Sequence, residues 1–276
     1  FALRERLAAA RPKEAPPLPD VPGPIPSIDV APFAMERWTS VLDHLGTPER
    51  SVHPRPFEMY GQNQGLMLYR TRLVGRKSGR LTITEPHDFA LVFVDGRLAG
   101  TLDRRLGEKT LELPATTNPM PVLDILIEGM GHINFAQEMI DRKGITDRVT
   151  LSGMTLMNWE VYRLPLSDAW MLGLRARAAA RATGGDAAPA SDTRPGVFFR
   201  GSFTLEAPRD TFLDLAGYRK GVVWVNGHNL GRYWDIGPQA RLYCPASFLL
   251  KGANEVIVLD LLKTDAAPLR GAATLR

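Results

Sequence analysis

Two short stretches of this 276-residue sequence decide its expected fold: LVFVDGRLAG at residues 91–100 and VVWVNGHNLG at residues 222–231. In each stretch an apolar run leads into an Asx-Gly pair, and a second run follows. Asx-Gly between apolar runs favours a two-residue hairpin turn, because both central residues of a type I′ turn need positive φ. Both stretches are therefore predicted to be β-hairpins, with Asp95 and Asn226 opening the turns.

The two hairpins lie 131 positions apart (222 minus 91), and this spacing recurs along the chain. It also relates Gly65 to Gly196, Pro114 to Pro245, and residues 125–127 to residues 256–258. One constant spacing across four separated segments indicates two copies of a single β-fold. The alternative is a chance alignment of two unrelated hairpins.

Short runs rich in β-branched and aromatic residues, separated by turn residues, occupy residues 65–166 and resume at residue 197. Short strands at regular spacing without intervening helices are typical of β-sandwiches and jelly rolls. The sequence therefore predicts an all-β fold made of two β-sandwich domains.

The remaining segments have other signals. Eight prolines fall between residues 12 and 32, and proline favours extended backbone at its own position and the one before it, so this part is predicted to be a connector. Apolar residues at helical spacing predict a short amphipathic helix over residues 35–45. A second short helix is predicted over residues 170–182, and a linker rich in Gly and Ala over residues 183–196.

The composition excludes several classes of protein. A hydrophobic fraction of 44% excludes a disordered chain, and no apolar run approaches the 18 residues of a membrane-spanning helix. The net charge is +4 with scattered basic residues, which does not indicate a nucleic-acid partner. The first residues lack the pattern of a signal peptide, and the compartment stays unassigned. The only cysteine, Cys244, lies in an apolar run and is predicted to be a core residue.

The familiar catalytic motifs do not occur: the sequence has no GxSxG, HExxH, GxxxxGK[ST] or GxGxxG. No two of the five histidines lie within five positions of each other, so no local metal pair is predicted. A retaining glycosidase needs two carboxylates about 5–5.5 Å apart. Candidate carboxylates occur, none of them in a motif that singles it out: Glu58, Asp88, Glu128, Glu138, Glu160 and Asp235. We therefore predict no catalytic residue, no metal ligand and no cofactor.

Aromatic and polar residues gather in GHNLGRYWDIGPQ, residues 227–239. Aromatic faces beside Asn, His and Arg donors suit a sugar, because the rings stack on its C–H face and the donors bind its hydroxyls. The candidate residues for sugar binding are His228, Arg232, Tyr233 and Trp234. One alternative is that aromatics of this region fill a sandwich core, and another is that Arg232, Tyr233 and Trp234 seal a domain interface.

Several long motifs resemble the glycoside hydrolase family 35 β-galactosidases. VWVNGHNLGRYWDIGPQARLYCPASFL (residues 223–249) resembles the signature near the C-terminus of that family. FEMYGQNQGLMLYRT (residues 57–71) resembles the start of its first β-domain. LIEGMGHINFAQEMIDRKGI (residues 126–145) and LMNWEVYRLPL (residues 156–166) continue that domain in the same order, and FALRE (residues 1–5) resembles the end of the catalytic barrel.

The resemblance implies two jelly-roll domains of galactose-binding-like fold behind a proline-rich connector. The implied organisation is a barrel exit and connector at 1–32, a first β-domain at 33–166, a linker at 167–195 and a second β-domain at 196–276. In the family, both catalytic glutamates belong to a TIM barrel, which takes about 250 residues. Their motifs have no counterpart here. The loop that matches GHINFAQ leans over the active site in the family, often with a tyrosine. Here Phe135 stands at that position beside Asn134, so only an apolar wall of the substrate rim is implied.

The resemblance thus implies a non-catalytic C-terminal β-region whose parent enzyme hydrolyses terminal β-galactosides with retention. The expected partner is the catalytic TIM barrel. A galactoside and a second copy of the chain are further candidates, whereas no nucleic acid or membrane partner is expected. If the barrel docks on this chain, Phe135 and its neighbours Met130 and Ile133 should form an exposed apolar patch. Two alternatives stay open, an autonomous carbohydrate-binding module and a purely structural or interaction domain.

Overall fold

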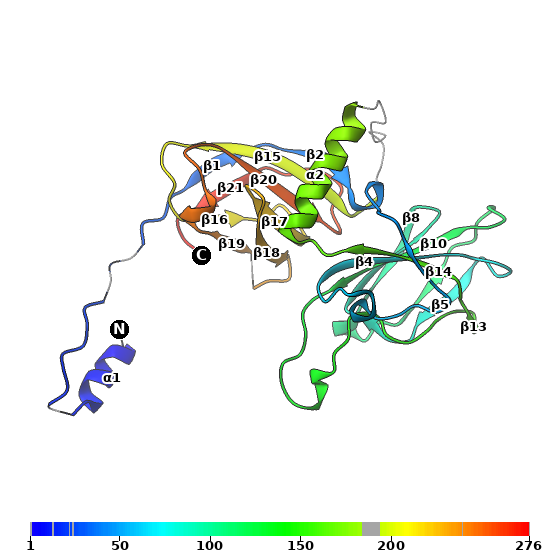
Figure 1. The fold of residues 1–276 in the computed structure, drawn as a ribbon, viewed down its shortest axis with the longest axis horizontal. Helices are drawn as coiled ribbons and strands as arrows, with labels where there is room; N and C mark the ends of the chain where they lie inside the picture. Colours follow the sequence, from blue (N-terminus) through cyan, green and yellow to red (C-terminus); the bar gives the residue numbers. More distant parts are fainter. Residues whose placement is uncertain are drawn as a thin grey trace.

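Two β-sandwiches side by side make up most of the chain in the computed structural model (Figure 1). The structure describes residues 2–12, 14–21, 23, 25–183, 194–238 and 240–275. Helix α1 (Ala2–Ala10) and an extended segment precede the sandwiches, and helix α2 (Asp168–Thr183) follows the first one. Neither helix in this described part of the chain has the length and apolarity needed to cross a membrane.

The first sandwich combines a six-stranded and a four-stranded sheet. In spatial order the six-stranded sheet contains β3 (Glu49–Ser51), β14 (Trp159–Leu164), β4 (Gly65–Arg72), β10 (Val122–Gly129), β7 (Phe89–Val94) and β8 (Arg97–Asp103). The four-stranded sheet contains β13 (Met154–Thr155), β12 (Val149–Leu151), β5 (Gly79–Ile83) and β9 (Thr110–Leu113). A small pair, β11 (Gly144–Ile145) with β6 (Pro86–His87), lies beside them. The described residues also contain five 3-10 turns: η1 (Val41–Asp43), η2 (Phe57–Tyr60), η3 (Arg104–Leu106), η4 (Gln137–Met139) and η5 (Ala246–Phe248).

The second sandwich repeats this plan with a five-stranded and a four-stranded sheet. The five-stranded sheet contains, in spatial order, β18 (His228–Trp234), β17 (Lys220–Val225), β20 (Gly252–Asp260), β15 (Val197–Leu205) and β2 (Met35–Ser40). The other sheet contains β1 (Val30–Phe33), β21 (Leu269–Ala272), β16 (Thr211–Asp214) and β19 (Arg241–Cys244). The predicted all-β fold of two sandwiches is confirmed.

The predicted internal repeat is also confirmed. Adding 131 to the bounds of β7, β8 and β9 gives the bounds of β17, β18 and β19, and the order β4-β10-β7-β8 matches β15-β20-β17-β18. The β-bulge between Val92 and Phe93 recurs between Val223 and Trp224. Asp95 and Asn226 both have φ of 49°, and a glycine with positive φ follows each, as a type I′ turn requires. Two unrelated hairpins would not share strand positions throughout both sheets.

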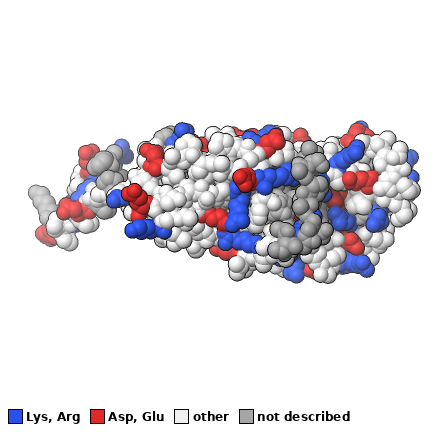
Figure 2. Space-filling model, turned by 90° about the horizontal axis from the view of Figure 1, so that it is seen from above, with Lys and Arg blue, Asp and Glu red and all other residues white. Residues whose placement is uncertain are grey.

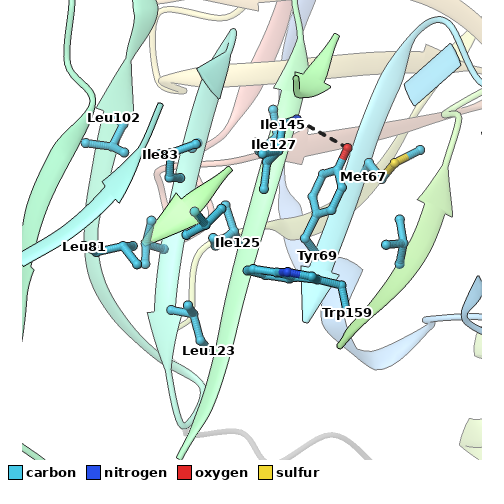
Figure 3. Packing of buried hydrophobic residues seen from close by; sticks show 14 of the residues in the cluster. Met67, Tyr69, Leu81, Ile83, Leu102, Leu123, Ile125, Ile127, Ile145 and Trp159 are labelled. Carbon is cyan, nitrogen blue, oxygen red and sulfur yellow. Dashed lines mark hydrogen bonds between the residues drawn. The ribbon is translucent and has the colours of Figure 1, made fainter. Parts of the chain in front are cut away.

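Each sandwich has its own hydrophobic core. In the first, alternate residues point inward: Met67 and Tyr69 of β4 join the core, together with Ile125 of β10 and Trp159 of β14 (Figure 3). The hydroxyl of Tyr69 donates a hydrogen bond to the carbonyl of Arg55 at 2.7 Å, which satisfies its only buried polar atom. Cys244 is buried in the second core, as predicted, and burial raises the pKa of its thiol to about 12.

A third hydrophobic cluster, the inter-domain cluster, joins the two sandwiches. It contains the residues of the two large sheets that point away from their own cores, such as Leu68 and Leu126 of the first and Trp224 and Ile257 of the second, with Met171 of α2. Every residue of β7 and of β17 is therefore buried. This explains the uninterrupted apolar runs in both hairpins, because a strand buried on both faces has no polar side.

The helix predicted over residues 35–45 is wrong. Residues 35–40 form β2, which pairs with β15 at the edge of the five-stranded sheet, and η1 follows. Backbone pairing and burial of Trp38 against the inter-domain cluster outweigh the local periodicity. Strands β1 and β2 thus hydrogen bond to the second sandwich, although their residues precede the first one in the sequence.

The other helix prediction is confirmed by α2, which covers residues 170–182. Most of the predicted linker, residues 184–193, lies outside the described residues. Figure 2 shows one face of the molecule, on which Lys and Arg are interspersed with Asp and Glu. This agrees with the scattered basic residues of the sequence.

Candidate functional site

The loop between β10 and β11, residues 130–143, carries the two predicted substrate-rim residues, and we name it the rim loop. It extends from the lower end of the first sandwich, in green in Figure 1. Phe135 is 79% exposed, and Ile133, Met139 and Ile140 are exposed as well. Asn134 is exposed beside Phe135. The predicted apolar patch therefore lies on the surface at Phe135 and Ile133, whereas Met130, at the start of the loop, is half-buried.

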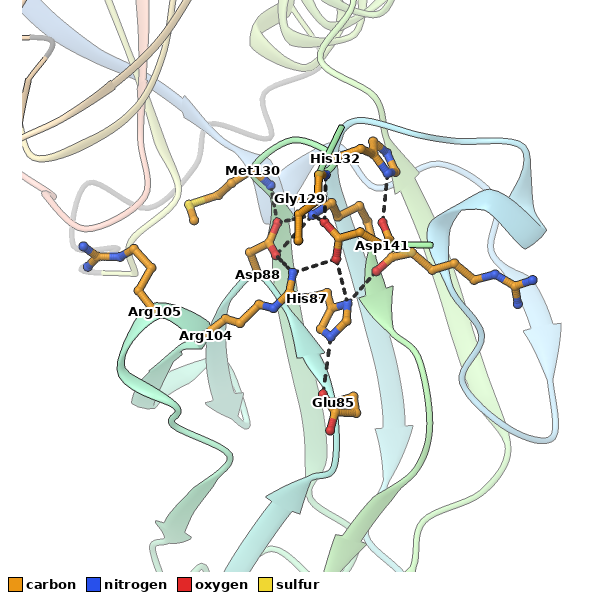
Figure 4. Close-up of polar contacts among 12 residues, drawn as sticks. Glu85, His87, Asp88, Arg104, Arg105, Gly129, Met130, His132 and Asp141 are labelled. Atoms are coloured by element: carbon orange, nitrogen blue, oxygen red, sulfur yellow. Dashed lines mark hydrogen bonds and ion pairs between the residues drawn. The ribbon is translucent and has the colours of Figure 1, made fainter. Parts of the chain in front are cut away.

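A buried ionic cluster fixes the base of the rim loop. Lys143, only 1% exposed, donates from Nζ to Asp88 Oδ2 at 2.9 Å and to Asp141 Oδ2 at 2.6 Å. Arg104 bridges the same two carboxylates with Nη1 at 2.7 Å from each (Figure 4). Oδ2 of Asp88, which Lys143 binds, also accepts a hydrogen bond from the Met130 amide at 2.7 Å. Two cations facing two carboxylates neutralise the cluster and tie both ends of the loop to β6, β7 and η3.

The same contacts decide the protonation of the two carboxylates. Burial alone would raise their pKa values, but hydrogen bonds and charge from Lys143 and Arg104 outweigh it and lower the pKa of both Asp88 and Asp141. Both groups are thus held as carboxylates. A glycosidase acid needs the opposite environment, one that raises the pKa of a carboxyl group.

Backbone contacts of two histidines add to this base. His132 lies with Nδ1 2.9 Å from the carbonyl of Asp141 (Figure 4). Its Nε2 is 3.0 Å from the carbonyl of Asn63. His87 lies with Nδ1 2.6 Å from the carbonyl of Arg142. The loop therefore leaves the sandwich through a tightly bonded base and presents its apolar tip, Phe135, to solvent.

The structure separates the four predicted sugar-binding residues. His228, at the start of β18, is exposed and stacks on Phe248, with ring centroids 4.3 Å apart. Tyr233 lies in the second core, where its hydroxyl contacts Asp260 and the carbonyl of Leu259 at 2.9 Å each. Burial raises its pKa well above the ordinary value.

Arg232 and Trp234 instead lie against the first sandwich. Arg232 donates from Nη1 to the carbonyl of Gly129 at 2.8 Å. Trp234 packs edge-on against Phe89 of β7, with centroids 5.7 Å apart, and the guanidinium of Arg105 lies 4.0 Å from its ring centre. Both side chains thus lie at the junction of the two domains, whereas His228 does not share a site with them.

Reasoning from the sequence missed the buried lysines Lys143 and Lys220. No sequence signal points to either: Lys143 follows the charged residues Asp141 and Arg142, and Lys220 follows Arg219. Each buried ammonium nevertheless needs an ion-pair partner, because an unpaired buried ammonium is costly. Among the described residues, no group of three or more His, Cys, Asp and Glu side chains could hold a metal ion.

Comparison with known proteins agrees with this architecture. Residues 54–165 match the family described as "Beta-galactosidase, first all-beta domain", and residues 196–254 match "Beta-galactosidase, galactose-binding domain". The chain is 37% identical over 228 residues to a β-galactosidase of Xanthomonas manihotis, covering 82% of this chain and 36% of that protein. It is 34% identical over 288 residues to a β-galactosidase of Bos taurus, covering 95% and 42%. It is also 34% identical over 267 residues to the human β-galactosidase-1-like protein 2, covering 91% and 39%.

These matches define the class as paired all-β domains of the kind found in β-galactosidases. The chain belongs to the β-galactosidase family and corresponds to its C-terminal domains. It spans about two fifths of the length of these curated relatives.

Proposed function

We propose that this chain is the non-catalytic β-region of a glycoside hydrolase family 35 β-galactosidase. A TIM-barrel domain would perform the retaining hydrolysis of terminal β-galactosides. The two sandwiches would brace that barrel, and the rim loop would supply an apolar wall to its galactose pocket through Phe135 and Asn134.

The observation that carries this proposal is the rim loop itself. A phenylalanine with 79% of its surface exposed, on the same loop as exposed Met139 and Ile140, is unfavourable on an isolated domain. The base of this loop is nevertheless held by a buried ionic cluster. A firmly anchored loop with an apolar tip is suited to docking against another domain. The chain covers only 36% and 42% of the length of two related β-galactosidases, which supports a catalytic domain distinct from these two sandwiches.

The ionisation of the buried carboxylates at the rim-loop base supports a structural rather than a catalytic role for this pair. Asp88 and Asp141 form the buried carboxylate pair at the rim-loop base, and both have lowered pKa values because Lys143 and Arg104 bind them. Neither can act as the proton donor that glycosidic cleavage requires.

A carbohydrate-binding module is the second candidate. The exposed His228 ring, stacked on half-buried Phe248, favours it, because an exposed ring with the exposed polar residue Asn229 next in the sequence offers a face on which a sugar ring can stack. Galactose titration observed by NMR would separate the two: shifts centred on His228 and Phe248 support the module, and unchanged spectra support the bracing role.

The docking proposal is tested with a catalytic domain encoded upstream of this sequence and expressed separately. The chain alone should not hydrolyse a chromogenic β-galactoside above the solution background, and it should bind the catalytic domain in calorimetry. Phe135→Ser should weaken that binding about 10–100-fold, the effect of leaving one phenylalanine side chain unburied.

Val74→Ser is the matched control for that substitution. Val74 is 72% exposed but follows the far end of β4, where Arg72 pairs with Val122, whereas the rim loop follows Gly129 at the opposite end. Equal affinity of the Phe135→Ser variant and the wild-type chain would refute docking through the rim loop. Turnover that survives repurification and disappears on mutation of a carboxylate in this chain would refute the non-catalytic assignment.

A further inference from the structure

The rim loop begins at the end of β10, where residues of the second domain contact Glu128, Gly129 and Met130 in succession. Lys220 of β17 forms an ion pair with Glu128, and each side chain is only 2% exposed. The same ammonium lies 3.6 Å from the sulfur of Met130. Arg232 of β18 binds the carbonyl of the residue between them, Gly129, at 2.8 Å.

Aromatic rings of both domains surround this contact and exclude water from it. The ammonium of Lys220 lies 3.7 Å from the ring centre of Trp234 and 5.1 Å from that of Phe89. Arg105 of the first domain covers Trp234. An ion pair enclosed in this way, with cation–π contacts on the ammonium, has a defined geometry and is weakly screened.

The contacted segment continues into the ionic cluster at the loop base. The amide of Asp88 donates to the carbonyl of Glu128 at 2.9 Å, and the carboxylate of Asp88 accepts from the amide of Met130 and from Lys143. A shift of residues 128–130 would therefore displace Asp88 and its partners. Contacts from the second domain thus act on the first residues of the rim loop through a continuous set of hydrogen bonds.

We propose that Lys220 and Arg232 are positioning residues through which the second domain orders the rim loop of the first. In this assignment the aromatic and cationic residues at the end of β18 serve as an inter-domain clamp. The proposal concerns the order of the loop and stands whether or not the loop docks on a catalytic domain.

Amide hydrogen exchange followed by NMR tests the clamp at the first part of the loop. The reporters are the amides of Met130 and Ile133, which hydrogen bond to Asp88 and Asp141. Arg232→Ala removes the bond to Gly129 and should accelerate exchange of both about tenfold, the loss expected for one bond to a charged donor. Exchange in β4, residues 65–72, should stay unchanged.

Two further variants make the result specific. Arg232→Lys keeps a cationic donor for the Gly129 carbonyl and should restore most of the protection. Arg219→Ala is the matched control, because Arg219 lies near the same junction but is 59% exposed and pairs with Asp235, so it should leave the loop amides unchanged. If Arg232→Ala does not fold, the double variant Glu128→Gln with Lys220→Met, which replaces the buried ion pair by neutral groups, serves with the same readout.

The clamp is overturned if loop exchange in the variant stays within about twofold of the wild-type rate, which is less than the loss of one hydrogen bond. It is equally overturned if exchange accelerates to the same extent in β4 and in the loop. That pattern would assign Arg232 to the overall stability of the domain rather than to the position of the loop.

Discussion

Replacing Lys143 with methionine should show what the ionic cluster contributes to the first sandwich. Methionine keeps most of the length of the side chain and removes its charge, so the loss is electrostatic rather than a cavity. Lys143 Nζ is 2.9 Å from Asp88 and 2.6 Å from Asp141, and all three groups are nearly inaccessible to solvent. Removing one partner of such a buried pair costs about 3–5 kcal/mol. Arg104 remains, half-exposed, and shares its charge between both carboxylates.

The pH dependence of this loss distinguishes a charge effect from a packing effect. In the wild-type protein the pKa values of Asp88 and Asp141 are lowered in the folded state. Their stabilisation is therefore complete above the ordinary Asp pKa of 3.8 and is lost as the pH falls below it, through the lower folded values. In Lys143→Met, burial without the ammonium favours the protonated carboxyls. The free-energy difference between variant and wild type should thus be largest near pH 7 and shrink towards pH 4.

Urea unfolding at pH 7, 5.5 and 4 measures this difference, with exchange of the β6 and β11 amides reporting on the first sandwich separately. Lys109→Met is the control, because Lys109 pairs with Glu85 where both side chains are about half-exposed. It should cost less than about 1 kcal/mol. A Lys143→Met loss below about 1 kcal/mol at pH 7, or one that is equal at pH 7 and pH 4, would refute the reasoning.

Three further perturbations test the two cores and one hairpin tip. Cys244 should react with a thiol reagent at pH 8 only after unfolding, measured with and without denaturant, because burial raises its pKa to about 12; rapid reaction in the native protein would contradict this. Gly144→Ala should destabilise the first sandwich by more than about 3 kcal/mol in urea, because Gly144 has φ of 88° and an added Cβ would overlap Tyr69 and Phe57; a loss below about 1 kcal/mol would contradict it. Asn226→Gly should cost less than Asn226→Ala, because glycine tolerates the φ of 49° although both lose the bond to Phe248; thermal melts with equal midpoints would contradict it.

Several elements could be predicted because their cause is local. The Asx-Gly pairs at residues 95 and 226 specify their own turns, and the turns fix the register of the strands on either side. The constant 131-residue spacing then indicated that the second sandwich repeats the fold of the first. The exposed position of Phe135 followed from the family resemblance and agrees with the structure. Whether it forms a substrate rim stays a prediction.

Other features depend on partners distant in the sequence. Residues 35–40 have a helical pattern, yet they form a strand because β15, more than 150 positions away, offers a free edge. The pairs Lys143 with Asp88 and Lys220 with Glu128 join residues 55 and 92 positions apart. No sequence window contains both members of either pair.

The sequence by itself therefore determined the class of fold, the repeat and the hairpin tips, since turn chemistry and alternating polarity act over a few residues. Only the tertiary structure decided which faces of the two large sheets meet, where Trp234 and Arg232 lie, and which charges are buried together. Burial and pairing are properties of a site assembled from several strands. The local sequence around Lys220 is compatible with a solvated or a buried side chain. Only the fold, which brings Glu128 and Trp234 to it, decides that the side chain is buried.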